Sequence, residues 1–303
     1  MYQFNSHACG GGHPRPAFGR GKLDIMKILN PHQLQQAEEV LRSYLPKSSK
    51  VYGFLFGMNR NKPRLMEVIV DSWPDFKIII LRPDPKNKHP LDNKVTFFST
   101  DDQILKSMLL DDRGLFWNKN ITIGGVNVCY ELMLREISAS KGLALKSFSS
   151  DHLMTLTDPS HLPHLEVSRD IESRISCLDE SHIGLVNATW KFGGNEWGFR
   201  KIKHSIQNFH SCCIVDEKGQ PVSWVVLYDY CAMGMLYTLP GHRQKGYAKL
   251  VISTLSRKLH SQGYPVYCFI EKENEDSYRL FSSLGFTEDP AYRAAWFKFS
   301  PST

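Results

Sequence analysis

A strand, a basic turn and a helix follow one another between Met235 and Gly263, and this succession most constrains how the chain can fold. Residues Met235 to Leu239 are apolar, aromatic or β-branched, which predicts a strand that ends at Pro240. From Leu250 to Leu259, leucine and valine recur at three- and four-residue spacing, which predicts a helix. The basic segment between strand and helix is therefore expected at a helix N-terminus.

That segment, Arg243-Gln244-Lys245-Gly246-Tyr247-Ala248, has the composition of an anion-binding site. At a helix N-terminus, free backbone N–H groups and the positive end of the helix dipole point at a bound anion. Gly246 and Ala248 are small enough for close approach, and Arg243 and Lys245 add positive charge. We expect a pyrophosphate-binding loop, although an ordinary strand–turn–helix with basic surface residues shows the same pattern.

Several motifs carry a resemblance to one family. The pattern R-x-x-G-x-A of this turn resembles the acyl-CoA loop of the GNAT superfamily of N-acyltransferases, and the segment NEDSYRLFSSLGF at 274–286 resembles its C-terminal motif. Between Met26 and Lys298 the chain also resembles the glycine N-acyltransferase family, a branch of that superfamily. The motifs are KVYG at 50–53, VDSWPDF at 70–76, FGGNE at 192–196, the pair Cys212-Cys213 with EKGQPVSW at 217–224, and YTLP at 237–240.

The resemblance implies an α+β protein in two parts. Residues 167–303 are expected to form a GNAT fold, a mixed sheet flanked by helices, which binds acyl-CoA and carries the catalysis. Residues 26–150 are expected to form a second α/β domain, either specific to the family or a degenerate GNAT-like unit. Residues 151–166 lie in the stretch that resembles the family least and are interpreted as a linker. Residues 1–25, rich in Gly and Pro, are interpreted as a disordered or targeting-like extension.

The periodicity predicts the individual elements. In the first part these are a helix after Pro31, a hairpin of Lys50–Phe56 with Leu65–Asp71, a third apolar run at Lys77–Leu81, and helices around 101–110 and 126–137. In the second part they are a strand at Arg174–Leu178, helices at Glu180–Trp190 and Asn195–Phe209, a hairpin of 211–215 with 222–230, strands at 231–239 and 264–271, a helix at 274–284 and a last strand at Ala294–Phe299.

Composition excludes several classes of protein. A net charge of +6 suits an anionic ligand such as CoA, but no DNA- or RNA-binding motif is present, so no nucleic-acid partner is expected. No apolar run is long enough to span a bilayer. The seven cysteines are scattered without a C-x-x-C pair, which predicts neither a metal site nor a disulfide framework.

We expect a monomer, and the resemblance implies that its partners are small-molecule substrates. The resemblance implies acyl-CoA as a co-substrate rather than a tightly bound cofactor, and glycine or another amino acid as the acceptor. It also implies a mitochondrial location, with the cytoplasm as the alternative. The N-terminal segment supports a mitochondrial location, because it carries Arg15, Arg20 and Lys22 and no acid before Asp24.

The resemblance further implies which residues hold CoA. The main chain at the end of the strand would bond to pantetheine, the loop would bind pyrophosphate, and the helix near the C-terminus would add polar contacts. The expected residues are Tyr237, Thr238, Leu239, Arg243, Gln244, Lys245, Gly246, Tyr247, Ala248, Asn274 and Ser277.

The catalytic base is the least defined part of the expected site. An amine is protonated at neutral pH, so its attack on a thioester needs a proton acceptor. The enzymes that this chain resembles place a glutamate at the position of Ala232, and an alanine accepts no proton. Asp229, Glu271, or a water relayed through Tyr230 or Tyr237 remain as stand-ins, each of which is also explained as a structural residue.

The expected function is transfer of an acyl group from CoA to the amine of glycine or a similar small amino acid. A second departure from the superfamily is Phe281, where many members carry a tyrosine that protonates the leaving thiolate. Ala232 and Phe281 together motivate the alternative of an acyl-CoA-binding protein with weak or no catalysis. A protein-lysine acyltransferase is disfavoured, because the first half resembles a domain attached to small-molecule acyltransferases.

Overall fold

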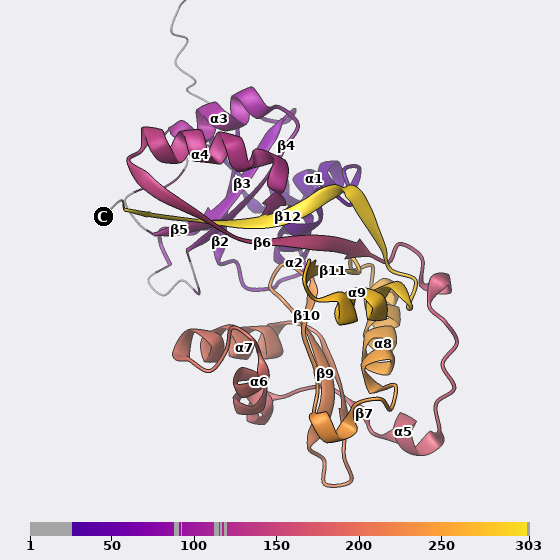
Figure 1. Cartoon of the computed structure of the whole chain (residues 1–303). Helices are drawn as coiled ribbons and strands as arrows, with labels where there is room; N and C mark the ends of the chain where they lie inside the picture. Colours follow the sequence, from indigo (N-terminus) through magenta and orange to yellow (C-terminus); the bar gives the residue numbers. More distant parts are fainter. Residues whose placement is uncertain are drawn as a thin grey trace, which may run out of the picture.

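The computed structural model describes residues 26–301, apart from 88–90, 92, 112–114, 116, 118 and 119. The strands of this part form one mixed sheet in the order β1-β2-β3-β4-β5-β12-β6-β11-β10-β9-β8-β7 (Figure 1). The pairs β4–β5 and β10–β11 are parallel. The strands are β1 (Lys27–Ile28), β2 (Met66–Val70), β3 (Ile78–Pro83), β4 (Lys94–Ser99), β5 (Ile121–Asn127), β6 (Leu143–Thr155), β7 (Ile175–Ser176), β8 (Ser211–Val215), β9 (Pro221–Leu227), β10 (Met233–Thr238), β11 (Tyr267–Glu271) and β12 (Thr287–Pro301).

Helices cover both faces of the sheet in each half of the molecule. They are α1 (Pro31–Arg42), α2 (Ser49–Met58), α3 (Asp102–Leu110), α4 (Glu131–Ser140), α5 (Arg169–Ser173), α6 (Ile183–Thr189), α7 (Glu196–Asn208), α8 (Tyr247–Ser261) and α9 (Glu275–Ser282), with short 3₁₀ turns at 128–130, 159–161, 180–182 and 240–242. Within the described residues, none of these helices is long and apolar enough to cross a membrane.

The central strands of the first half are buried on both faces, which explains their continuous apolar sequences. Along β3, Ile78 and Ile80 pack in the core beneath α3 and α4, whereas Ile79 and Leu81 pack in the core formed with α1 and α2. Successive side chains of a strand point to opposite faces, so a strand buried on both faces has no polar side to show.

The second half has the same layered arrangement. Helix α8 packs Val251, Leu255 and Leu259 against one face of the sheet, in the same core as Val225 of β9. On the other face, α6 and α7 pack against Trp224 of β9. Figure 1 shows α6 and α7 on one side of β9 and β10 and α8 and α9 on the other.

Most predicted elements of the second half are confirmed. Asn195 caps α7 by accepting a hydrogen bond from the N–H of Gly198 at 2.8 Å, as expected for a helix start. The hairpin of β8 with β9 lies where the turn at 216–220 predicts it. The strand expected at Arg174–Leu178 is shorter than predicted, because α5 extends to Ser173 and only Ile175 and Ser176 pair with β8.

The prediction of a strand at Lys50–Phe56 is wrong, because this segment lies in helix α2. Most of its residues are buried, including Val51, Tyr52, Leu55 and Phe56. A short apolar run without alternation has neither a helical nor a strand period, so sequence alone does not separate the two. The predicted hairpin is absent accordingly, and β2 pairs with β1 and β3 instead.

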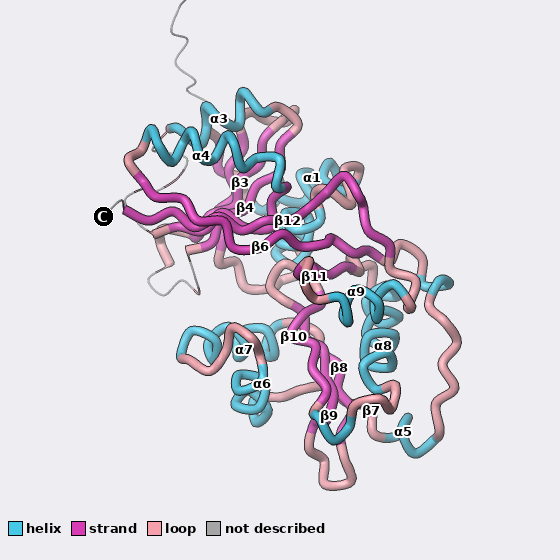
Figure 2. Tube along the Cα trace, viewed as in Figure 1, coloured by secondary structure: helices cyan, strands magenta, loops and turns pink. Residues whose placement is uncertain are grey.

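The linker predicted at residues 151–166 is wrong at its start, because Asp151 to Thr155 belong to β6. This strand pairs with β11 on one side and with β12 on the other, and β12 in turn pairs with β5. Figure 2 shows β6 and β12 crossing the middle of the molecule side by side. The last strand of the chain thus completes a sheet that the first half begins. The extension predicted at 1–25 lies outside the described residues.

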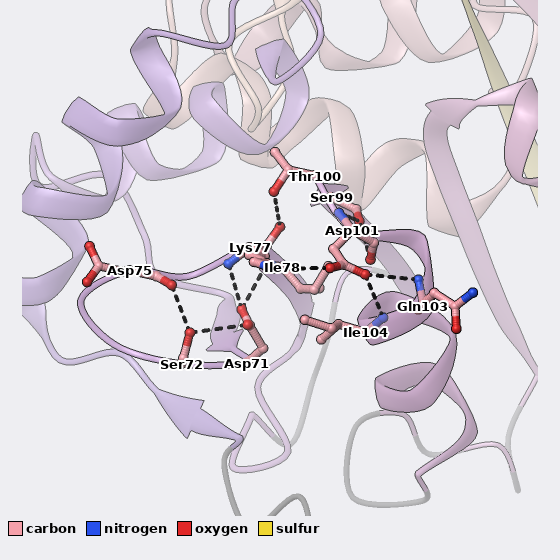
Figure 3. A network of polar contacts seen from close by, with 10 residues as sticks. All are labelled: Asp71, Ser72, Asp75, Lys77, Ile78, Ser99, Thr100, Asp101, Gln103 and Ile104. Carbon is pink, nitrogen blue, oxygen red and sulfur yellow. Dashed lines mark hydrogen bonds and ion pairs between the residues drawn. The ribbon is translucent and has the colours of Figure 1, made fainter.

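The motif VDSWPDF, which carried part of the family resemblance, forms the turn between β2 and β3 (Figure 3). The carboxylate of Asp71 accepts hydrogen bonds from the N–H groups of Lys77 and Ile78 at 2.9 and 2.8 Å. The hydroxyl of Ser72 donates to the carbonyl of Asp75 at 2.9 Å. Close by, the side chain of Asp101 caps α3, so these bonds fix the turn between β2 and β3 and the start of α3.

The contact of α2 with the second half depends on a glycine. A Cβ on Gly53 would lie 1.9 Å from the carbonyl oxygen of Tyr230, and the thiol of Cys231 donates to the carbonyl of Gly53 at 3.3 Å. A Cβ on Gly57, one turn further, would meet its nearest atoms at 3.6 Å, an ordinary contact.

We predict that Gly53→Ala lowers the free energy of unfolding by about 1–3 kcal/mol, because the helix must move away from Tyr230. Gly57→Ala is the matched control and should raise it by up to about 1 kcal/mol, since alanine is the better helix former. Urea denaturation measures both. Equal effects of the two substitutions would contradict the contact.

Candidate active site

A gap between two parallel strands defines the candidate site. Strands β10 and β11 pair at one position only, Met233 with Cys268. Beyond it β10 turns away, with a register shift against β9 between Gly234 and Tyr237 and a left-handed backbone at Met235, φ 51°. The two strands therefore part in the middle of the sheet.

A large cavity fills this gap, with a volume of about 1170 Å³. Residues 233–237 of β10 line one side and residues 268–271 of β11 line the other. The lining also includes Lys50 of α2, Asp151 of β6 and Trp296 of β12, so both halves of the chain contribute to it.

Aromatic rings form a continuous surface in this cavity, which we call the aromatic wall. Its ring centroids follow one another at 5.2–6.3 Å: Trp197–Trp190 5.6 Å, Trp190–Tyr228 6.3 Å, Tyr228–Tyr230 5.2 Å, Tyr230–Phe269 6.3 Å and Phe269–Trp296 5.5 Å. Such a surface favours an apolar or planar ligand group.

Charged side chains stand among these rings. The ammonium of Lys201 pairs with Asp229 at 2.9 Å, and Lys191 pairs with Glu271. The ammonium of Lys50, on a side chain that is almost fully buried, donates to the carbonyl of Gly124 at 2.7 Å. It also lies over the rings of Tyr230 and Trp296, at 4.9 and 5.2 Å.

The basic loop at residues 243–248 reaches the edge of this cavity where Arg243 contacts Tyr237. Gly246 is the N-cap of α8 and has a φ of 76°, a conformation that favours glycine. Arg243, Gln244 and Lys245 are exposed beside it. The guanidinium of Arg243 lies 5.6 Å from the ring of Tyr237, which lines the cavity.

The comparisons with known proteins identify the family. Residues 25–210 match the sequence model described as aralkyl acyl-CoA:amino acid N-acyltransferase, and residues 212–300 match the model of its C-terminal region. This chain belongs to the aralkyl acyl-CoA:amino acid N-acyltransferase family.

Curated relatives agree with this assignment. Glycine N-acyltransferase of Bos taurus is 30% identical over 281 residues, covering 87% of this chain and 95% of that protein. Glycine N-acyltransferase-like protein 1 of Homo sapiens is 29% identical over 284 residues, covering 87% of this chain and 94% of that protein.

Solved structures confirm the predicted fold class. A Drosophila protein has a TM-score of 0.74 at 17% identity, covering 92% of this chain and 100% of that chain. A tandem GNAT protein from the clavulanic acid biosynthesis pathway has a TM-score of 0.51 at 12% identity, covering 92% of this chain and 99% of that chain.

The structure brings some of the expected CoA-binding residues together at the cavity of this acyltransferase. Tyr237, Asn274 and Ser277 line it. Asn274 also caps α9, accepting from the N–H of Ser277 at 3.1 Å. Phe281, in the place of the superfamily tyrosine, lines the cavity and packs on Phe286.

Other expected residues have groups that are already engaged. The N–H of Leu239 donates to the carbonyl of Val222 at 2.9 Å, and the carbonyl of Thr238 accepts from Arg243 at 3.1 Å. Tyr247 is buried in the core, whereas Ala248 in the first turn of α8 is half-buried.

The candidate bases differ in their surroundings. Ala232 is 1% exposed and lies in a buried cluster with Leu153 and Tyr267, so this position carries no proton acceptor. Asp229 and Glu271 both line the cavity, but each is joined to a lysine.

Asp151, Lys50 and Trp296 line the cavity without having been expected there from the sequence. These residues reach the cavity because folding places β6 beside β11, β12 beside β6 and α2 against the backbone of Tyr230, although these segments are far apart in the sequence. Among the described residues, no group of three or more His, Cys, Asp or Glu is placed to hold a metal ion.

We predict a structural role for the ion pair of Asp229 with Lys201. Asp229→Ala should lower stability by about 2–4 kcal/mol, because it leaves the buried ammonium of Lys201 less compensated. The double variant Asp229→Ala/Lys201→Met should recover part of this loss. Thermal denaturation measures both, with the exposed Lys203→Ala as control. A loss of turnover without a loss of stability in Asp229→Ala would contradict the structural role.

Proposed function

We propose that this protein transfers an acyl group from the thioester of acyl-CoA to the amine of glycine or a similar small amino acid. The observation that carries the proposal is the cavity at the parting of β10 and β11, in a chain of an acyl-CoA:amino acid N-acyltransferase family. Acyl-CoA acts as a co-substrate, and its CoA leaves after each turnover.

The loop before α8 is the proposed pyrophosphate site. The first N–H groups of a 15-residue helix and its dipole attract an anion, and Arg243 and Lys245 add charge. From there the pantetheine arm would run between β10 and β11, with Asn274 and Ser277 as polar contacts. The exposed edge of β10 at Leu236 and Tyr237 supports strand-like hydrogen bonds to its amides.

The acyl group would then lie against the aromatic wall. A planar aromatic acyl group gains offset or edge-to-face contacts there and buries apolar area. The word aralkyl in the family description fits such a group. Benzoyl-CoA is therefore the donor that we expect to react best, with acetyl-CoA filling less of the cavity.

Catalysis requires the amine to lose a proton before its nitrogen attacks the thioester carbonyl carbon. The C–N bond forms, the C–S bond breaks, and CoA leaves as a thiolate. The alternative of an acyl-CoA-binding protein without catalysis has no support in the comparisons, since the curated relatives above are named as acyltransferases or as like them.

We predict amino-acid-dependent CoA release from benzoyl-CoA, measured as free thiol with glycine, glutamine and other amino acids. Arg243→Ala should raise the KM for acyl-CoA about 10- to 100-fold, because it removes a charge-assisted bond to phosphate. Lys218→Ala, an exposed lysine in the β8–β9 turn, is the control and should leave the KM unchanged. No thiol release with any donor and acceptor pair would overturn the proposal.

We further propose a mitochondrial location and a monomeric chain. The basic N-terminal segment without an acid before Asp24 supports the first. Fluorescence microscopy of the full chain with a C-terminal tag tests it, and a cytoplasmic signal would contradict it. Sedimentation of the purified protein tests the second.

A further inference from the structure

Asp151 is a buried carboxylate that lines the cavity and belongs to none of the ion pairs described above. Asp151 lies in β6, between β11 and β12, directly opposite Glu271 on one neighbour and Ala294 on the other. Its side chain lines the cavity at the end of β11 where β10 has already parted. It therefore stands beside the gap through which a thioester would enter.

Asp151 is buried and incompletely satisfied. The residue is 7% exposed, and its Oδ1 has no hydrogen-bond partner in the structure. Among the described residues no cation forms an ion pair with it, in contrast to Asp229 and Glu271. A buried carboxylate oxygen without a donor is costly unless a ligand or its own protonation satisfies it.

The surroundings of Asp151 make it a stronger base. Burial, together with the nearby carboxylates of Glu271 and Glu273, raises the pKa of this carboxyl to about 7, although a hydrogen bond from Ser149 and the charge of Lys191 act in the opposite direction. Lys50 of α2 and the Lys201–Asp229 pair line the same cavity, and β12 presents uncharged Ala294. A proton acceptor with a pKa near 7 is suited to catalysis at neutral pH.

Asp151 also lies close to Ala232, the position at which this chain lacks a carboxylate. Ala232 shares its buried cluster with Leu153, which lies two residues along β6 from Asp151. Side chains two residues apart on a strand point to the same face and are separated by about 7 Å. Asp151 thus lies one side-chain position away from the cluster that contains Ala232.

We propose that Asp151 is the general base of the acyl transfer, replacing from β6 the carboxylate that β10 lacks. This inference rests on the proposed function. The carboxylate of Asp151 takes one proton from the ammonium of the acceptor, whose nitrogen then attacks the thioester carbonyl carbon. As the C–S bond breaks, the thiolate of CoA takes the second proton from the nitrogen. Asp151 returns its proton to water, which leaves the amide, CoA thiol and one proton.

The test compares the pH dependence of turnover in the wild type, Asp151→Asn and Asp151→Glu, with benzoyl-CoA and the best acceptor. In the wild type, kcat should fall about tenfold per pH unit below the pKa of about 7, as the base becomes protonated. Asp151→Asn should lose about 10²- to 10⁴-fold in kcat and lose this acidic limb, with an unchanged KM for acyl-CoA. Asp151→Glu should restore part of the rate and the limb.

Stability separates a folding defect from a catalytic one. Because the pKa of Asp151 is raised in the folded state, its charge destabilises the fold increasingly as the pH rises from about 4 to 7. Asp151→Asn should therefore melt at a higher temperature than the wild type at pH 8, with the difference closing toward pH 4. Asp75→Asn, in an exposed turn, is the matched control and should keep the wild-type rate and profile.

The outcomes distinguish this inference from the function on which it rests. Wild-type rates and an unchanged acidic limb in Asp151→Asn would overturn the role of Asp151 and leave the acyltransferase intact. Loss of the limb in Asp229→Asn or Glu271→Gln instead would overturn it too, and would name the base. A wild type that releases no CoA with any amino acid would overturn the proposed function and the inference together.

Discussion

Strands β10 and β11 are joined only through the pairing of Met233 with Cys268, and the site is built around the gap that follows. Backbone N–H and C=O groups inside a protein need partners, so two strands part within a sheet only where a ligand or water can replace their bonds. The left-handed residue Met235 and the register shift against β9 turn β10 away while its other edge stays paired. The cavity therefore exists because β10 and β11 separate within the sheet.

The first half of the chain supplies part of the wall of this cavity. Gly53 brings α2 against the backbone of Tyr230, which places Lys50 in the cavity. Strand β12 passes back between β5 and β6 and supplies Trp296 to the aromatic wall. Neither half would enclose the cavity alone, so the two parts expected from the sequence act as one unit at the site.

Local signals in the sequence predicted much of the fold, because they depend on neighbouring residues. The cap at Asn195, the glycine before α8 and the β8–β9 turn are examples. Helix α2 was missed because an apolar run buried on nearly all sides has no period. Strand β6 was missed because its strand conformation depends on pairing with β11 and β12, far away in the chain. Asp151 could not be assigned to the site for the same reason, because only this pairing brings it to the cavity. The absence of a carboxylate at Ala232, in contrast, follows from the sequence alone.

The proposed binding mode of acyl-CoA can be tested by a crystal structure with a thioether analogue of benzoyl-CoA, which cannot transfer its acyl group. We predict that its pantetheine arm lies between β10 and β11, with the pyrophosphate at the Arg243–Gly246 loop. The aromatic acyl group should lie against Tyr230, Phe269 and Trp296, with the carboxylate of Asp151 facing the acyl carbon across room for one amine. An analogue bound outside the gap, or an acyl carbon turned away from Asp151, would contradict the account.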